Sequence, residues 1–139
     1  MTKRLLLTLS LGLFATMGFA QTGKYWSANP VAASSIPTDK AVKRPTFPKE
    51  FKLFNLNIEP LRNELYKVVD NRVSHTNVIS LPNADGQLED FEIVEASNFE
   101  PALQARFPEI RAFSGKGITD KTAYLKLSIS PQGIQTMIF

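Results

Sequence analysis

The single histidine, His75, is the residue on which most hydrolytic mechanisms in this chain would depend. Zinc catalysis needs two or three imidazole or carboxylate groups that converge on the metal, and the sequence has no His-Glu-x-x-His run. A Ser-His-Asp triad would have to recruit His75, which stands in the loop 73–76 with no strained turn around any serine. A thiolate nucleophile is excluded because the chain has no cysteine. We therefore predict no catalytic residue, no cofactor-binding residue and no metal ligand.

A run of acidic residues is the second feature that could take part in catalysis or binding. Residues 85–100 hold six carboxylates and no Lys or Arg, whereas 21–50 and 101–139 are each net positive. Two carboxylates could flank a glycosidic bond, but alternate residues of a strand point to opposite faces, which leaves only Asp90 and Glu92 together. The favoured interpretation is a solvated acidic strand that faces basic neighbours, with a cation site or a partner-facing surface as alternatives. That partner-facing stretch would comprise Glu89, Asp90, Glu92 and Glu95.

The first twenty residues have the pattern of a secretory signal peptide. Lys3 and Arg4 precede an apolar run, 5–15, and small residues then stand at the positions −3 and −1 before a cleavage point between Ala20 and Gln21. A membrane-spanning helix needs about 20 apolar residues, so a membrane anchor is the weaker alternative. The lack of cysteine excludes a lipid anchor and disulfides. We expect a secreted or periplasmic product that has no membrane contact after cleavage.

Loss of the signal peptide would change the charge balance. The 16 basic residues become 14, against 13 acidic ones, so the mature chain would carry a net charge of only +1. A nucleic-acid-binding domain normally shows a clustered basic face, and the sequence has no such cluster in its structured part. We therefore expect no nucleic-acid partner, and the remaining length suits one domain.

Prolines separate two regions of the mature chain. The segment 21–50 contains four prolines and no sustained periodicity, which predicts a linker. Tyr25 and Trp26 are the exception, because an aromatic pair could dock on the body of the domain or remain a mobile decoration. A β-rich domain is expected over 51–139, where apolar and polar residues begin to alternate.

Within that domain the patterns predict short strands joined by tight turns. A strand at 54–58 leads into a helix near Pro60, with Leu61 and Leu65 on its apolar stripe. Asp85-Gly86 predicts a hairpin between strands 78–81 and 88–94. A second hairpin joins a strand at 123–130, with Leu125, Leu127 and Ile129 on its inner face, to a strand at 134–139.

Three further expectations concern particular residues. Phe91 and Leu127 should lie in the core, and a short helix at 101–106 should use Leu103 and Phe107 as its apolar contacts. Gly115-Lys116-Gly117 should be a flexible turn. The predicted fold class is α+β, a mostly antiparallel β-sheet built from hairpins with one or two short helices.

The runs 78–91, 107–118 and 127–133 resemble the N-terminal pro-region of secreted, reprolysin-like zinc metalloproteases of Bacteroidetes, in the same order and with similar spacing. They include Pro82-Asn83-Ala84-Asp85-Gly86, Phe107-Pro108-Glu109-Ile110 and Ser130-Pro131-Gln132-Gly133. In that family a signal peptide and this β-rich segment precede a protease domain that carries an extended zinc motif, and many members end in a sorting domain for type IX secretion.

The resemblance implies a non-catalytic pro-region that assists folding and maintains latency of a metalloprotease domain in cis. Zinc would belong to that domain, and no zinc ligand carries over to this chain. Because there is no cysteine, latency would come from covering the cleft, from lending an edge strand or from a carboxylate, for which 89–95 is the candidate surface. The chain stops inside an apolar run at 137–139, which predicts a segment truncated at its C-terminal end. The alternative is a free-standing secreted or periplasmic binding or protease-inhibitor module.

Overall fold

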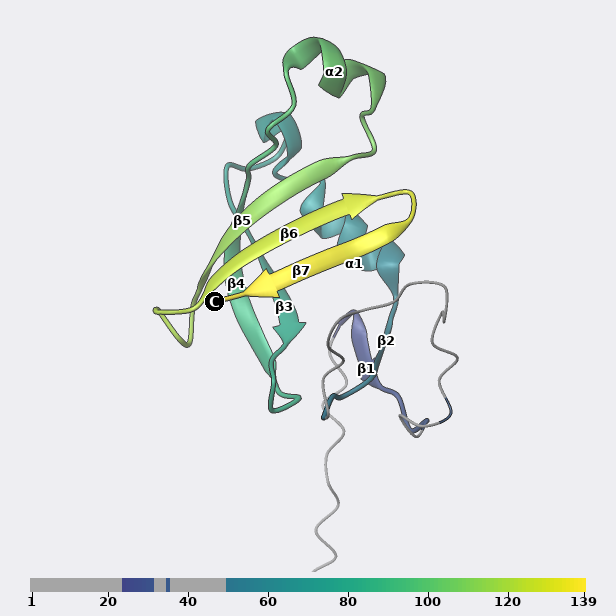
Figure 1. Cartoon of the computed structure of the whole chain (residues 1–139). Helices are drawn as coiled ribbons and strands as arrows, with labels where there is room; N and C mark the ends of the chain where they lie inside the picture. Colours follow the sequence, from purple (N-terminus) through teal and green to yellow (C-terminus); the bar gives the residue numbers. More distant parts are fainter. Residues whose placement is uncertain (1–23, 32–34, 36–49) are drawn as a thin grey trace, which may run out of the picture.

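The computed structural model describes residues 24–31, 35 and 50–139 (Figure 1). The expected signal peptide, its cleavage point between Ala20 and Gln21, and most of the expected linker lie outside the described residues. None of the described helices is long and apolar enough to cross a membrane. The elements in chain order are β1 (Trp26–Ala28), β2 (Phe54–Leu56), α1 (Ile58–Leu65), the 3₁₀ turn η2 (Val69–Asn71), β3 (Asn77–Pro82), β4 (Leu88–Glu95), α2 (Pro101–Arg106), β5 (Arg111–Gly117), β6 (Tyr124–Ser130) and β7 (Gly133–Ile138).

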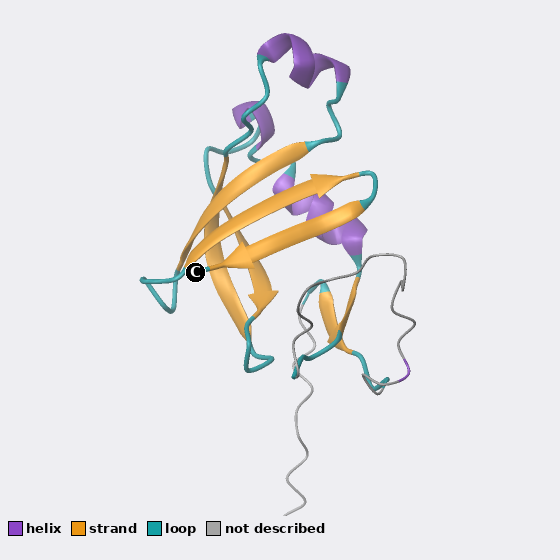
Figure 2. Ribbon diagram, in the orientation of Figure 1, coloured by secondary structure: helices purple, strands orange, loops and turns teal. Residues whose placement is uncertain are grey.

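The described chain is mostly β, so the α+β assignment is wrong. Its seven strands form two antiparallel sheets, β1–β2 and β3–β4–β5–β6–β7, and the larger sheet curls into a half-barrel (Figure 2). Only two α-helices accompany them, and α2 has six residues. The sequence patterns underestimated the strand content, because β1 lies within the Pro-rich segment and β5 includes residues that were expected to turn.

Both expected hairpins are confirmed. In the first, β3 pairs with β4, and the backbone N–H of Gly86 donates to the carbonyl of Asn83 at 2.9 Å. Gly86 has a φ of +80°, a conformation that glycine adopts without steric cost. A Cβ atom there would also lie 2.9 Å from Cδ of Lys52. In the second hairpin, the turn at Pro131 and Gln132 joins β6 to β7.

The expectation of a flexible turn at Gly115-Lys116-Gly117 is wrong, because these residues are part of β5. That strand pairs with β4 on one side and β6 on the other. A Cβ atom at Gly115 would lie 3.1 Å from side-chain atoms of both Ile93 and Leu125. The absence of a side chain at Gly115 therefore allows close packing inside a central strand.

The hydrophobic core fills the inner face of the curled sheet, and α1 packs against it. The helix contributes Leu61 and Leu65, both fully buried as the apolar stripe predicted. Phe91 and Leu127 are confirmed as core residues, with 0% and 3% of their surface exposed. The other buried apolar residues are Tyr25, Val68, Val69, Ile79, Leu81, Ile93, Phe113, Ala123, Leu125 and Ile129.

The N-terminal aromatic pair docks on the domain, which settles the alternative left open by the sequence. Tyr25 is 5% exposed and belongs to the core, while Trp26 starts β1, which pairs with β2. Just before them, Lys24 forms an ion pair with Glu64 of α1. The segment with Lys24, Tyr25 and Trp26 is thus attached to the rest of the domain by side-chain packing, strand pairing and an ion pair, although more than twenty residues of sequence separate them.

α2 is helical as expected, but its expected apolar contacts are wrong. Leu103 and Phe107 are 39% and 38% exposed, and the helix buries none of its residues. It is held by polar contacts instead, because Nε2 of Gln104 donates to the carbonyl oxygens of Phe107 and Ile110 at 3.0 and 2.9 Å. In Figure 1, α2 projects from the end of the sheet at which β4 ends and β5 begins.

Candidate functional site

The structure divides the expected acidic stretch between the two faces of β4. Asp90 and Glu92 are exposed on the outer face, where Asp90 accepts a hydrogen bond from the Ser80 hydroxyl at 2.5 Å and Glu92 lies opposite Lys116 of β5. Glu89 and Glu95 lie on the other face, and both are only partly exposed. A single four-carboxylate surface is therefore not formed.

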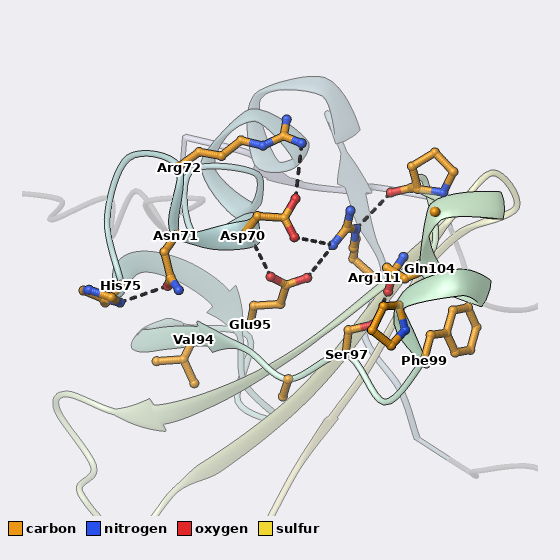
Figure 3. A pocket seen from close by; sticks show the side chains of 14 residues that line it. Asp70, Asn71, Arg72, His75, Val94, Glu95, Ser97, Phe99, Gln104 and Arg111 are labelled. Atoms are coloured by element: carbon orange, nitrogen blue, oxygen red, sulfur yellow. Dashed lines mark hydrogen bonds and ion pairs between the residues drawn. The ribbon is translucent and has the colours of Figure 1, made fainter.

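Glu95 lies on the floor of a cleft of about 810 Å³ between the η2 turn and α2 (Figure 3). Its Oε1 atom accepts from Nη1 of Arg111 at 2.8 Å, and the Arg111 side chain is only 7% exposed. The same Nη1 atom lies 3.2 Å from Oδ1 of Asp70, while Nε of Arg111 donates to the carbonyl of Pro108 at 3.0 Å. The cluster joins β4, β5, the η2 turn and the loop after α2.

The electrostatics of this cluster keep Arg111 charged. Burial on its own lowers the pKa of Arg111, but the hydrogen bond that Arg111 donates to Glu95 and the charges of Asp70 and Glu95 outweigh burial, so the pKa is raised. Glu95 also accepts the backbone N–H of Asp70 at 2.8 Å through Oε2. Since both oxygens of Glu95 are engaged inside the fold, this residue is a structural anchor and is not available to bind a partner.

The anchor holds a strained turn in place. Asp70 and Asn71 have φ angles of 52° and 53°, in the left-handed region that residues with a Cβ rarely adopt. Arg111 and Glu95 fix the carboxylate and the N–H of Asp70, respectively. The sequence could have indicated this role, because Arg111 and Phe113 are two residues apart and therefore share the inner face of β5.

His75 lines the rim of the cleft in an exposed loop, as expected. Its Nδ1 atom lies 2.9 Å from Oδ1 of Asn71. Among the residues that the structure describes, no three His, Asp or Glu side chains converge as a metal site would require. The cleft therefore brings charged groups together without a free acid–base pair.

A serine–lysine pair that sequence reasoning missed lies on the outer face of the sheet. Nζ of Lys126 donates to the hydroxyl of Ser114 at 2.9 Å and to the Tyr124 hydroxyl at 3.3 Å. Hydrogen bonds with Ser114 and then with Lys126 lower the pKa of Tyr124. Ser114 stands in the middle of β5 between two paired strands, so the backbone N–H groups around it take part in the ladder and cannot form an oxyanion hole. The pair connects β5 to β6.

The β3 edge of the five-stranded sheet is partly covered. Along β3 the backbone groups of Val78, Ser80 and Pro82 point away from β4, because hydrogen-bonded and non-hydrogen-bonded pairs alternate in an antiparallel ladder. The indole N–H of Trp26 donates to the Ser80 carbonyl at 2.9 Å. Pro82 has no N–H to offer. Such features are known devices that prevent an edge from pairing with another chain.

The β7 edge is open. Tyr124 and Phe139 exchange both backbone hydrogen bonds, so the alternation directs the backbone groups of Ile134, Thr136 and Ile138 away from β6. Within the described part of the chain these outward groups have no hydrogen-bond partner. Residues 131–139 carry no charged side chain. The exposed apolar residues at this edge are Met137, Ile138 and Phe139.

Comparison of the chain with models of protein families, with curated proteins and with solved structures finds no match. Outside the cleft, the outward backbone groups of Ile134, Thr136 and Ile138 have no hydrogen-bond partner within the described chain. That arrangement is suited to binding a polypeptide strand.

Proposed function

We propose that this chain is a non-catalytic, exported pro-region that assists folding and maintains latency of a secreted zinc metalloprotease, and that it contacts the protease through β7. The observation that carries the proposal is the difference between the two edges of one sheet. The β3 edge receives Trp26 and ends in Pro82, whereas the β7 edge has no charged side chain and presents backbone groups that are unpaired within the described residues. An edge of the second kind is a template for an added strand.

The geometry favours the lending of an edge strand over the carboxylate mode of latency. A carboxylate that blocks a metal must be free to leave its own fold, but Glu95 is bound through both oxygens to Arg111 and to the Asp70 backbone. Asp90 accepts the Ser80 hydroxyl and Glu92 lies opposite Lys116. Along β7, in contrast, a protease segment would gain main-chain hydrogen bonds with Ile134, Thr136 and Ile138 without disturbing the domain.

The first test is to read the coding frame beyond Phe139. We expect an open frame that continues into His-Glu-x-x-His-x-x-Gly-x-x-His, the set of ligands from which the zinc of the protease domain would be bound. A stop codon directly after Phe139 would contradict a pro-region in cis. It would favour the alternative of a free-standing secreted or periplasmic binding or inhibitor module, which would use the same edge.

The second test asks whether β7 is the surface that contacts the protease. The protease domain encoded downstream should be inhibited by residues 21–139 added in trans, and Thr136→Pro should weaken this inhibition at least tenfold because it removes an outward N–H from the edge. Glu92→Gln is the matched control on the outer face and should leave inhibition unchanged. Equal inhibition by the wild type and Thr136→Pro would show that the contact with the protease lies outside β7. Loss of inhibition in Glu92→Gln would show that the acidic surface takes part in the contact.

A further inference from the structure

We propose that the chain also pairs with a second copy of itself through β7, with a two-fold axis at Thr136. The inference rests on the proposed use of β7 as a pairing edge, but the occupant is another molecule of this chain. In the pair, two five-stranded sheets would become continuous across the axis. Self-pairing would then compete with pairing to the protease for the same backbone groups.

The backbone fixes the register of the pair. Only the outward residues Ile134, Thr136 and Ile138 can exchange hydrogen bonds with a new neighbour. An axis at Thr136 places Ile134 of one copy opposite Ile138 of the other and Thr136 opposite its own counterpart. All outward residues of both copies are then used. An axis displaced to another position leaves at least one of these three residues of each copy without one of the other two, or itself, as its partner.

The side chains complement one another in this register. On the inner face, half-buried Ile134 would lie beside Ile138, which is 36% exposed. On the outer face Gln135 would lie opposite Met137. At each end Gly133 would lie opposite Phe139, which is 68% exposed. A Cβ atom at Gly133 would meet nothing within 4 Å in the described chain, and an aromatic ring over a strand glycine is an arrangement that stabilises glycine positions in sheets.

Charge and symmetry also favour a closed pair. No charged side chain in 131–139 opposes the approach of an identical strand, although edge strands commonly carry one for that purpose. Pairing of β7 with β3 of another copy would build open chains of molecules. That contact is disfavoured because Ser80 already accepts the Trp26 indole and Pro82 has no N–H. Two-fold pairing of β7 with β7 uses each edge once and closes.

The chain has no native cysteine, which allows a direct test of the register. The protein is purified after export through its own signal peptide, and its mass in solution is measured over a range of concentrations. We expect a concentration-dependent dimer. The variant Thr136→Cys should form a disulfide-linked dimer on mild oxidation, because the two Cα atoms at position 136 would be about 5.5 Å apart, within the range that a disulfide spans.

Two matched variants complete the test. Ile138→Cys should not cross-link, because the two copies of position 138 would be about 13 Å apart along the strands. Thr136→Lys places two like charges opposite each other at the axis and should weaken dimerisation at least tenfold, with an unchanged circular dichroism spectrum. A monomer at every concentration, a stronger cross-link at 138 than at 136, or a dimer that Thr136→Lys leaves intact would each overturn the proposal. None of these outcomes affects the test of the proposed function, which reads protease inhibition and the coding frame.

Discussion

β3 and β7 are the two edge strands of the same five-stranded sheet, but their outward backbone groups have different surroundings. At β3, the N-terminal segment with Tyr25 and Trp26 packs against the domain. Tyr25 is buried, and the Trp26 indole N–H donates to the Ser80 carbonyl. At β7, the backbone groups of alternate residues point away from the sheet, and the neighbouring side chains are apolar and exposed. The two edges therefore differ in what they leave available for another polypeptide.

From this difference we infer that the segment 24–26 contributes more to the stability of the fold than β7 does. Lys24, Tyr25 and Trp26 attach to α1, to the core and to β3, respectively. β7 pairs with β6 alone in the described structure, and Ile134 is its one residue that packs against the buried core there. Variants at the β3 side should consequently change stability, and variants at the β7 side should change association.

The largest effect is expected from Tyr25→Ala. Removal of a buried aromatic ring leaves a cavity, and the free energy of unfolding should fall by about 3–5 kcal/mol, a large share of the stability of a small domain. The matched change at the open edge, Phe139→Ala, should alter it by less than about 0.5 kcal/mol, because that ring is 68% exposed. Urea denaturation of both variants measures the two values. Similar losses in the two variants would contradict the comparison.

The second prediction concerns pH at the covered edge. Glu64 accepts hydrogen bonds from Lys24, Lys67 and Asn77, which lower its pKa from 4.5 to about 2. Because the folded pKa lies below that of the unfolded chain, protonation favours unfolding. The contribution of Glu64 is therefore complete above about pH 5 and is lost as the pH falls towards 2. The lowered pKa corresponds to about 3 kcal/mol, and solvent screening at the exposed Lys24 and Lys67 reduces the expected total to about 2 kcal/mol.

Urea denaturation at a series of pH values from about 6 to 3 checks this contribution. Glu64→Gln should be less stable than the wild type near pH 6, and the difference between the two proteins should shrink as the pH falls. Other carboxylates titrate in the same range, so the difference between the two proteins is the informative quantity. A difference that stays constant with pH would show that the contacts of Glu64 do not depend on its charge.

The third prediction concerns the Trp26 indole that covers the β3 edge. Trp26→Phe keeps an aromatic ring but removes the indole N–H that Ser80 accepts. The free energy of unfolding should fall by about 1 kcal/mol. Circular dichroism is the suitable probe, because Trp26 is the only tryptophan and its fluorescence is lost in the variant. An unchanged stability would mean that water replaces the indole at this carbonyl without cost.

The comparison of edges also shows which parts of the fold the sequence could predict. The hairpin at Asp85-Gly86 was found because its signal is local: glycine accepts the φ that the turn needs. The bond from Trp26 to Ser80 joins residues 54 positions apart, and no local pattern determines such a contact. The sequence therefore left open whether Tyr25 and Trp26 dock on the domain or remain a mobile decoration.

The errors in the core of the sheet have a related cause. Gly115 was assigned to a turn because glycine is more common there, but its role depends on Ile93 and Leu125 from two neighbouring strands. Arg111 was not identified as a buried anchor, because its partners Glu95 and Asp70 come from two other elements. A pattern along one strand cannot show what a neighbouring strand presents.

The smallest effect on stability is expected at the open edge, and it tests the direction of the backbone groups. The N–H of Thr136 points away from β6, whereas that of Gln135 points towards Ser128 in the ladder. Thr136→Pro should therefore cost less than about 1 kcal/mol, as proline is tolerated where an edge N–H faces solvent. Gln135→Pro loses a ladder hydrogen bond and should cost about 1–3 kcal/mol more.

Both proline variants should be measured by urea denaturation at a dilution where the chain is monomeric, so that self-pairing does not add to the stability of the wild type. The two sites are adjacent in the sequence and both side chains are exposed, so burial cannot explain a difference between them. If Thr136→Pro proves as destabilising as Gln135→Pro, the N–H of Thr136 already has a partner. The β7 edge would then be closed, and the proposed pairing with the protease and with a second copy would both lose their structural basis.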